Sequence, residues 1–259
     1  MELRSAALRA LEVDDPVAKV AAVQALDVAA GPVDTQVLMQ PRQVLPGRPI
    51  KPRLVHPNRL PRRSAHSPAG RAALLHAVAH IEFNAINLAL DAAWRFAGMP
   101  EAFYRDWLRV AAEEAYHFTL VAGHLATLGH VYGDFDAHDG LWAMTERTAA
   151  DPTARMALVP RTLEARGLDA TPPMQAQLRK AGDETAVAIL EVILRDEIGH
   201  VAVGNHWYRW LCARDGLDPL THYARLAAEH RAPILRPPFN RVARRAAGFS
   251  EDEIAALGS

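Results

Sequence analysis

Two Glu-x-x-His motifs are the residues of this chain best suited to chemistry: Glu114-Ala-Tyr-His117 and Glu197-Ile-Gly-His200, each inside a long segment with helical periodicity. Three residues of α-helix turn the chain by about 300° and rise by about 4.5 Å, so both side chains of a motif project from one face. A carboxylate and an imidazole on one face can share a cation. The spacing therefore favours metal binding, although motif matches need support from their surroundings.

The surroundings of both glutamates are apolar. Besides the motif histidine, the residues one helical turn from Glu114 or Glu197 are Val110, Ala111, Phe118, Ile193, Leu194 and Val201. An ionised carboxylate on such a core-facing stripe costs several kcal/mol unless it is paired, so something must compensate it. The sequence leaves two candidates for that partner, an arginine or a metal ion.

Three further glutamates extend the candidate set. Glu82 has apolar helical neighbours and no basic residue among them. Glu164 has Arg161 one turn back, so a solvated Arg161–Glu164 pair is the alternative to metal ligation there. Glu191 also has apolar neighbours, but it points about 120° away from Glu197 unless a π-bulge re-aims the helix. Glu191 is therefore an alternative or a supplement to Glu164.

Long helical segments must carry these side chains. We predict them at about residues 67–98, 100–128, 140–166 and 174–213, with a separate turn before Gly182-Asp183 as an alternative start of the last segment. Ser67 and Pro68 are an N-cap followed by proline at the first helical position, and Asp151-Pro152 and Pro160 predict a split or kinked third segment. No useful stretch alternates polar and apolar residues, which predicts an all-α protein.

The two ends of the chain differ from its middle. Short helices are predicted at about 2–11 and 15–29, and eight prolines between residues 31 and 68 predict an extended arm. A short helix near 220–230, a second proline-rich arm and a small helix that begins with a Ser250–Glu253 capping box follow the last long segment. The expected organisation is an N-terminal hairpin and arm at 1–66, a bundle at 67–216 and a C-terminal arm with short helices at 217–259.

The first arm is basic, because arginine and lysine occur between Asp34 and Glu82 while aspartate and glutamate do not. One interpretation is a site for phosphate or RNA. The other is an arm that wraps over the acidic rims of its own bundle. We favour the second, because the arm lacks the interleaved aromatic residues that stack on bases.

Composition sets broader limits. With 29 basic and 30 acidic residues, the chain has no overall charge that would draw it to nucleic acid or to a membrane surface. Cys212 is the only cysteine, which excludes an internal disulfide and thiolate-rich metal sites and fits a reducing compartment. The N-terminus has no apolar run of the length that a secretory signal needs. We expect a cytoplasmic protein that does not enter a membrane.

The complete set of four carboxylates and two imidazoles matches the ligand pattern of ferritin-like di-iron and di-manganese proteins. Two stretches, Leu-Val-Pro-Arg-Thr-Leu-Glu-Ala-Arg-Gly-Leu-Asp at 158–169 and Ile-Leu-Arg-Asp-Glu-Ile-Gly-His-Val at 193–201, are similar to the signatures of an uncharacterised bacterial family within the ferritin-like superfamily. The likeness covers roughly residues 65–245. It implies a four-helix bundle with two iron ions, or manganese or a mixed iron–manganese pair, and it strengthens Glu164 as a ligand.

The ligands that follow from this resemblance are Glu82, Glu114, His117, Glu164, Glu197 and His200. The first functional hypothesis is an oxidoreductase, an oxidase or oxygenase that uses O2 on an unidentified small molecule or modified nucleotide, with a homodimer as the form to test for. A metal-handling protein of the ferroxidase type is the second. The third is a metal-stabilised protein that binds RNA or phosphorylated ligands. Fold analogy alone cannot choose among them.

Overall fold

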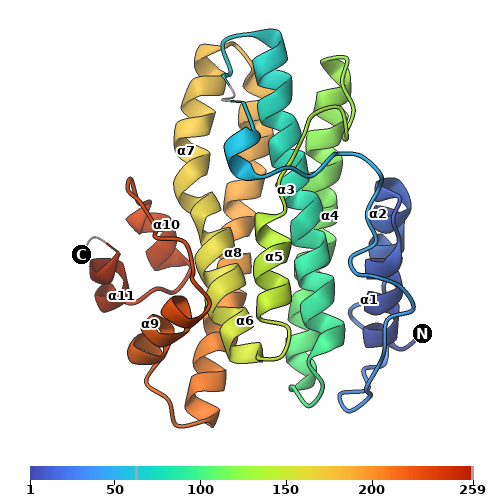
Figure 1. The fold of residues 1–259 in the computed structure, drawn as a ribbon, viewed down its shortest axis with the longest axis vertical. Helices are drawn as coiled ribbons and strands as arrows, with labels where there is room; N and C mark the ends of the chain where they lie inside the picture. The colour runs from blue at the N-terminus through green and yellow to red at the C-terminus, as the bar shows by residue number, and fades with distance from the viewer. Residues whose placement is uncertain (62–63, 258–259) are drawn as a thin grey trace. The chain divides into compact units, whose positions relative to one another are not determined.

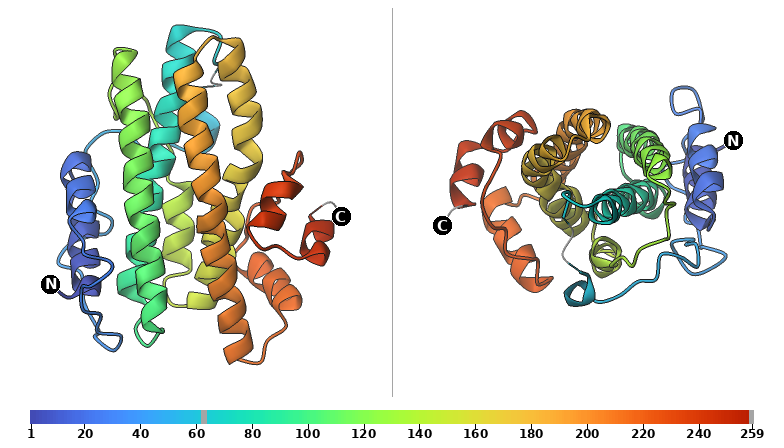
Figure 2. Two further views of the ribbon diagram at one scale, coloured as in Figure 1. Left: turned by 180° about the vertical axis from the view of Figure 1, so that it is seen from behind. Right: turned by 90° about the horizontal axis from the view of Figure 1, so that it is seen from above.

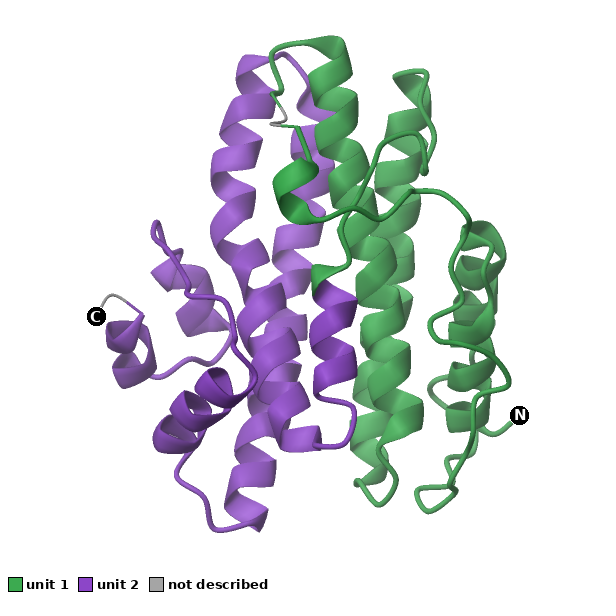
Figure 3. Cartoon of the chain, viewed as in Figure 1, with its two compact units in different colours: residues 1–140 green, residues 141–259 purple. Residues whose placement is uncertain are grey.

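The computed structural model describes residues 1–61 and 64–257 (Figures 1 and 2). Over these residues the chain forms helices joined by loops, and its extended segments pair only at an isolated parallel bridge between Leu54 and Ala137. The all-α prediction is thus confirmed for the part of the chain that is described. By its internal contacts the chain divides into unit 1, residues 1–140, and unit 2, residues 141–259 (Figure 3). The boundary falls within the segment 67–216 that the sequence predicts as a bundle.

Unit 1 is built on a hairpin of two long helices. Its elements are α1 (Leu3–Glu12), α2 (Pro16–Gln24), a 3-10 turn (Pro57–Arg59), α3 (Pro68–Arg95) and α4 (Glu101–Thr127). Helices α3 and α4 lie side by side, α1 packs on α3, and α2 packs on α4 (Figures 1 and 2). The predicted N-cap at Ser67 is confirmed, because its side chain accepts from the backbone of Gly70, and Asp15 caps α2 in the same way by accepting from the backbone of Ala18.

Helix α3 is apolar along most of its length. By length and composition it could cross a membrane, but 78 % of its most apolar 18-residue window is buried inside the structure. This burial is that of a core helix, consistent with a soluble protein. The cytoplasmic location stays a prediction.

The proline-rich arm of unit 1 is held by buried cations and surface ion pairs. The buried Arg4 guanidinium donates to the carbonyls of Asp34 and Val37 in the arm and of Trp94 in α3. Further along, Arg48 pairs with Asp139 at 2.7 Å and Arg53 pairs with Asp136 at 2.5 Å. These pairs support the interpretation that the arm covers acidic parts of its own unit. Arg62 and Arg63, which add to the arm's charge, lie outside the described residues.

Unit 2 is built on a second long hairpin. Its elements are α5 (Gly140–Arg147), α6 (Pro152–Leu158), a π-helix (Val159–Glu164), α7 (Ala165–Lys180), α8 (Glu184–Arg214), α9 (Pro219–Glu229), α10 (Arg241–Ala246) and α11 (Glu251–Ala256). The first half of the hairpin is interrupted, because α6, the π-helix and α7 follow one another, and its second half is the single helix α8. Helices α6 and α7 both pack on α8, and α9 and α10 contact the same group of helices (Figure 2). The predicted split at Asp151-Pro152 and the irregularity at Pro160 are confirmed, as is the Ser250–Glu253 capping box.

Two boundaries in unit 2 differ from the prediction. The fourth long helix begins at Glu184 instead of near 174, because residues 165–180 continue the third segment as α7. The chain then turns at Gly182, whose φ of +77° lies in the left-handed region that favours glycine. The residues before Gly182 belong to α7, which contains Pro172 and Pro173 in its interior. Helix α10 was missed, because its six residues are too few to show a period.

Candidate metal centre

Unit 1 places three predicted ligands together. Glu82 on α3 and Glu114 and His117 on α4 are 3 %, 1 % and 0 % exposed. The Nδ1 atom of His117 lies 3.3 Å from Oε2 of Glu82 and 3.4 Å from Oε2 of Glu114. Because α3 and α4 are unbroken and adjacent, their regular geometry is sufficient to bring a lone glutamate onto the Glu-x-x-His motif of the next helix.

The charge state of His117 follows from this arrangement. Burial alone would lower the pKa of its imidazole, but the carboxylates of Glu114 and Glu82 outweigh burial and raise the pKa to about 11. At neutral pH the imidazole of the metal-free protein is therefore a cation facing two buried carboxylates. A divalent ion at this position would take over that role, and its binding would release the proton.

Unit 2 carries the second motif on α8. His200 is 1 % exposed and Glu197 is 9 % exposed, and Nδ1 of His200 lies 3.6 Å from Oε1 of Glu197. This distance is within ion-pair range but too long for a good hydrogen bond. The pair is thus looser than the His117 cluster of unit 1.

Glu164 is the last residue of the π-helix, between α6 and α7. A π-turn inserts an extra residue into the helical ladder and re-aims the side chains that follow, and such turns are frequent at functional sites. The alternative Arg161–Glu164 surface pair is wrong, because Arg161 is only 3 % exposed and pairs with Glu253 at 2.5 Å. From the sequence, a π-bulge is the condition under which Glu191 could join the site. The structure instead has its π-helix at Val159–Glu164.

The alternative candidate Glu191 lies away from these buried motifs. Glu191 is exposed on α8, which argues against its role as a replacement ligand. Two other groups serve local contacts: Glu146 accepts from Trp142 at 2.9 Å, and His80 bonds to Tyr132 at 2.9 Å. Tyr116, beside His117 in the sequence, is 48 % exposed.

The two units repeat one pattern of donors. In each, a lone glutamate on one helical segment precedes a Glu-x-x-His motif on the next, and the separations are similar, from 82 to 114 and from 164 to 197. Within unit 1, the two carboxylates of Glu82 and Glu114 and the imidazole of His117 are buried donors that could help to hold a metal ion, and Glu197 of unit 2 is a buried donor of the same kind. Such oxygen and nitrogen donors suit iron or manganese.

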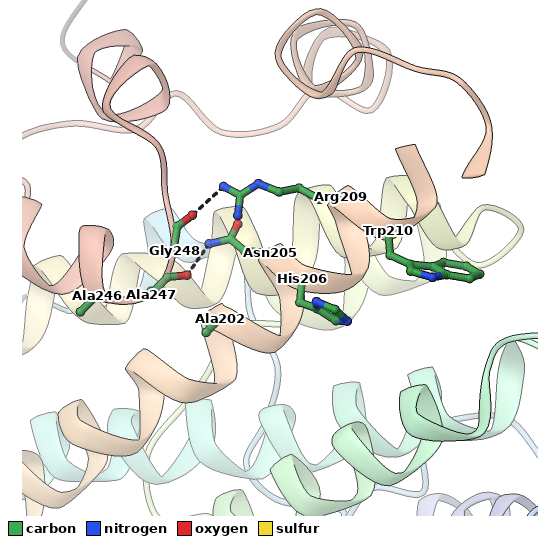
Figure 4. Close-up of a pocket in the computed structure, with 8 residues that line it drawn as sticks. All are labelled: Ala202, Asn205, His206, Arg209, Trp210, Ala246, Ala247 and Gly248. Carbon is green, nitrogen blue, oxygen red and sulfur yellow. Dashed lines mark hydrogen bonds between the residues drawn. The ribbon is translucent and has the colours of Figure 1, made fainter. Parts of the chain in front are cut away.

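Unit 2 also contains a pocket of about 400 Å³ (Figure 4). It is lined by Ala202, Asn205, His206, Arg209, Trp210, Ala246, Ala247 and Gly248. Arg209 is nine residues from His200, a rotation of about 900°, so the pocket faces the opposite side of α8 from the motif histidine. The pocket is thus separate from His200, the predicted metal ligand on α8. Nothing in the sequence pattern had singled it out.

Comparison with known proteins gives a family and a relative. A family model described as "Protein of unknown function (DUF455)" matches residues 12–255. An uncharacterized protein of Haemophilus influenzae (strain ATCC 51907 / DSM 11121 / KW20 / Rd) is 53 % identical over 221 residues, which are 83 % of this chain and 77 % of that protein. No solved structure matches.

Proposed function

We propose that this chain, which belongs to the DUF455 family, is a ferritin-like di-iron protein that uses O2 to oxidise a small organic substrate. The observation that carries the proposal is the repeated donor pattern: a lone glutamate and a Glu-x-x-His motif in each unit, with both motifs buried. In this proposal the two long hairpins supply the four helices of a ferritin-like bundle, and each hairpin contributes half of the ligands.

Charge balance supports a pair of divalent ions. Glu82, Glu114, Glu164 and Glu197 together bring four negative charges, which two divalent cations neutralise. The structure fits this requirement in unit 1, where Glu82 and Glu114 already face a cation, the imidazolium of His117. Carboxylates buried to this degree are tolerable only with such compensation.

The protein's own residues would hold and shield the ions. His117 and His200 would each give one ring nitrogen, and the carboxylates would supply the oxygens. Aliphatic side chains near the motifs, such as Val121 and Val201, are fully buried and exclude water. The iron pair supplies the redox chemistry when bound. Manganese or a mixed pair would use the same donors.

The alternative of an RNA-binding or phosphate-binding arm has less support. Arg48 and Arg53, two of the arm's cations, pair with Asp139 and Asp136 of unit 1. Binding of phosphates would have to compete with these pairs. Affinity for RNA that falls steeply with salt and is lost when Arg48 and Arg53 are replaced would favour this alternative.

The test is anaerobic reconstitution with Fe(II), followed by removal of unbound metal and exposure to O2. We expect about two irons per chain and O2 consumption that depends on them. A panel of small organic compounds then separates the two redox functions: an oxidase or oxygenase turns over repeatedly with its substrate, whereas a metal-handling protein consumes O2 only in proportion to added Fe(II). Failure to retain iron or manganese would overturn the proposal.

A further inference from the structure

The C-terminal helices of unit 2 hold the π-helix that carries Glu164. Two short hydrogen bonds of Arg161 connect the π-helix to α8 and α11. The Arg161 guanidinium donates through Nη2 to Oε1 of Glu253 on α11 at 2.5 Å and through Nη1 to Oδ1 of Asn205 on α8 at 2.6 Å. The pair with Glu253 is buried, with side chains only 3 % and 5 % exposed.

Aromatic rings surround the same guanidinium. Its central carbon lies 5.0 Å from the ring centre of Tyr208, 5.2 Å from that of Tyr223 and 4.9 Å from that of Phe249. These rings come from α8, α9 and the loop before α11. Cation–π attraction and a desolvated ion pair together fix the position of Arg161 much more firmly than a surface pair would.

The neighbours of Arg161 are held as well. The hydroxyl of Thr162 donates to the carbonyl of Ala157 at 2.8 Å, five residues back in the π-helical register, and bonds to the Tyr223 hydroxyl at 2.9 Å. Pro160 packs against Gly204 of α8 so closely that a Cβ atom at Gly204 would lie 2.6 Å from the proline ring. Only glycine permits this approach.

The C-terminal segment is itself anchored. Arg244 of α10 is fully buried and pairs with Asp169 of α7 at 2.6 Å. Arg209 of α8 donates to the carbonyl of Gly248 and to Glu253, and Asn205 donates to the carbonyl of Ala247 (Figure 4). Apolar residues of α7, α8, α10 and α11 form one buried cluster beneath these bonds.

Several polar residues of the segment 158–169 contact the C-terminal helices. Arg161, Thr162 and Asp169 each bind the helices that follow α8, and Glu164 is the acidic residue at the end of the π-helix. We infer that the C-terminal segment, through Glu253 and Arg161, is a positioning device that fixes the π-helix and thereby aims Glu164 as a metal ligand. The inference rests on the proposed function for the ligand role of Glu164, but the holding contacts are a property of unit 2 alone.

The test compares Glu253→Gln with Glu251→Gln in the full-length protein. The Glu253→Gln substitution keeps the size of the side chain but leaves the buried Arg161 without its carboxylate, whereas Glu251 is exposed and pairs with the exposed Arg245. Mn(II) alone is the probe, titrated anaerobically. We expect at least about tenfold weaker binding of one of two ions in Glu253→Gln and wild-type binding in Glu251→Gln.

A second readout needs no metal. Hydrogen exchange of the backbone amides of residues 157–166 in the metal-free protein should be about tenfold faster in Glu253→Gln, while α3 and α4 exchange as in the wild type. Tyr223→Phe, which removes only the hydroxyl on Thr162, should give a change of about fivefold in the same direction. If Glu253→Gln fails to fold, Tyr223→Phe still tests whether these contacts hold the π-helix.

The outcomes separate the two proposals. Wild-type protein that binds no Mn(II) or Fe(II) overturns the di-metal function and the ligand role of Glu164, and faster exchange would then still show that the contacts hold the π-helix. Two ions bound with unchanged affinity in Glu253→Gln and Tyr223→Phe overturn the positioning role while the di-metal function stands. Unchanged exchange at 157–166 overturns the holding contacts themselves.

Discussion

Units 1 and 2 present the same types of donors by different structural means. In unit 1 the glutamate and the Glu-x-x-His motif lie on two unbroken helices, and His117 bridges both carboxylates within 3.4 Å. In unit 2 the motif lies on a regular helix, α8, but Glu164 ends a π-helix between two helical pieces. The first arrangement follows from helix geometry. The second depends on contacts with residues far away in the sequence.

Because of this difference, each unit is sensitive to substitution at a different place. In unit 1 the buried carboxylates of Glu82 and Glu114 lie close to the imidazole of His117, so the stability of the metal-free protein depends on His117. In unit 2 the buried ion pair joins Arg161 of the π-helix to Glu253 of α11. The geometry of the π-helix, and with it the position of Glu164, therefore depends on the C-terminal helices. Substitutions that are equivalent by sequence motif should therefore have unequal effects in the two units.

The largest effect should come from the motif glutamates themselves. Glu114→Ala and Glu197→Ala each remove a buried carboxylate that we propose as a ligand, so each variant should lose about one metal ion or more per chain. Glu113→Ala, one residue away and partly exposed, is the matched control and should keep the wild-type metal content. Metal analysis after anaerobic reconstitution measures this. Equal content in all three variants would contradict the ligand assignment.

The two motif histidines should differ in the metal-free protein. His117→Leu removes the cation that faces two buried carboxylates and should lower the free energy of unfolding by about 3–5 kcal/mol, the usual result of breaking a buried ion pair. His200→Leu should cost about 1–2 kcal/mol, because Nδ1 of His200 lies at a longer 3.6 Å from the carboxylate of Glu197. Urea unfolding at about pH 6 compares them, and equal losses would remove the proposed contrast between the units.

The loss in His117→Leu should also depend on pH. Because the folded-state pKa of His117 is raised to about 11 from an ordinary value of 6.5, its stabilising contribution is complete below pH 6.5 and declines as the pH rises toward 11. The difference in unfolding free energy between wild type and His117→Leu should therefore shrink steadily above pH 6.5. A difference that grows with pH would mean that the imidazole is neutral in the metal-free protein.

A smaller effect is expected at the glycines of α8. Gly204→Ala should destabilise the protein by about 1–3 kcal/mol, because the new Cβ would overlap the ring of Pro160 in the π-helix. Gly199→Ala lies on the same helix with no atom within 4 Å of the new Cβ and should stabilise the protein by about 0.5–1 kcal/mol. Thermal unfolding of both variants measures the contrast. Similar shifts in both would argue against close packing at Gly204.

The smallest effect should come from the arm of unit 1. Arg53→Ala removes an exposed pair with Asp136, so metal content and melting temperature should stay at their wild-type values. This result would contrast with Glu253→Gln, whose pair is buried in unit 2. A loss of metal in Arg53→Ala would show that unit 1 also depends on its terminal segment.

Much of the fold could be predicted from local signals in the sequence. Helices α3 and α4 and the caps at Ser67, Asp15 and Ser250 follow from periodicity and capping residues that act within a few positions. The stretch just before Gly182-Asp183 was harder to assign, because prolines disfavour a helix interior while α7 stays helical through Pro172 and Pro173. Tertiary contacts outweigh local propensity there.

The ligands could be predicted to different extents for the same reason. Glu82, Glu114 and Glu197 stood out because their helical neighbours are apolar, and all three are buried in the structure. Glu164 remained ambiguous because Arg161 lies one turn back. The partner of Arg161 is Glu253, 92 residues later, and no local pattern could reveal that pairing. The exposed position of Glu191 likewise follows from how α8 packs.

The number and magnetic coupling of the irons in reconstituted protein decide whether this chain holds a di-iron centre. Mössbauer spectroscopy of protein loaded anaerobically with ⁵⁷Fe(II) and then exposed to O2 gives both. We predict about two irons per chain, oxidised as a magnetically coupled pair, in the wild type, and loss of the coupled pair in Glu114→Ala and Glu197→Ala. Isolated, uncoupled iron in the wild type, or none retained, would contradict the account.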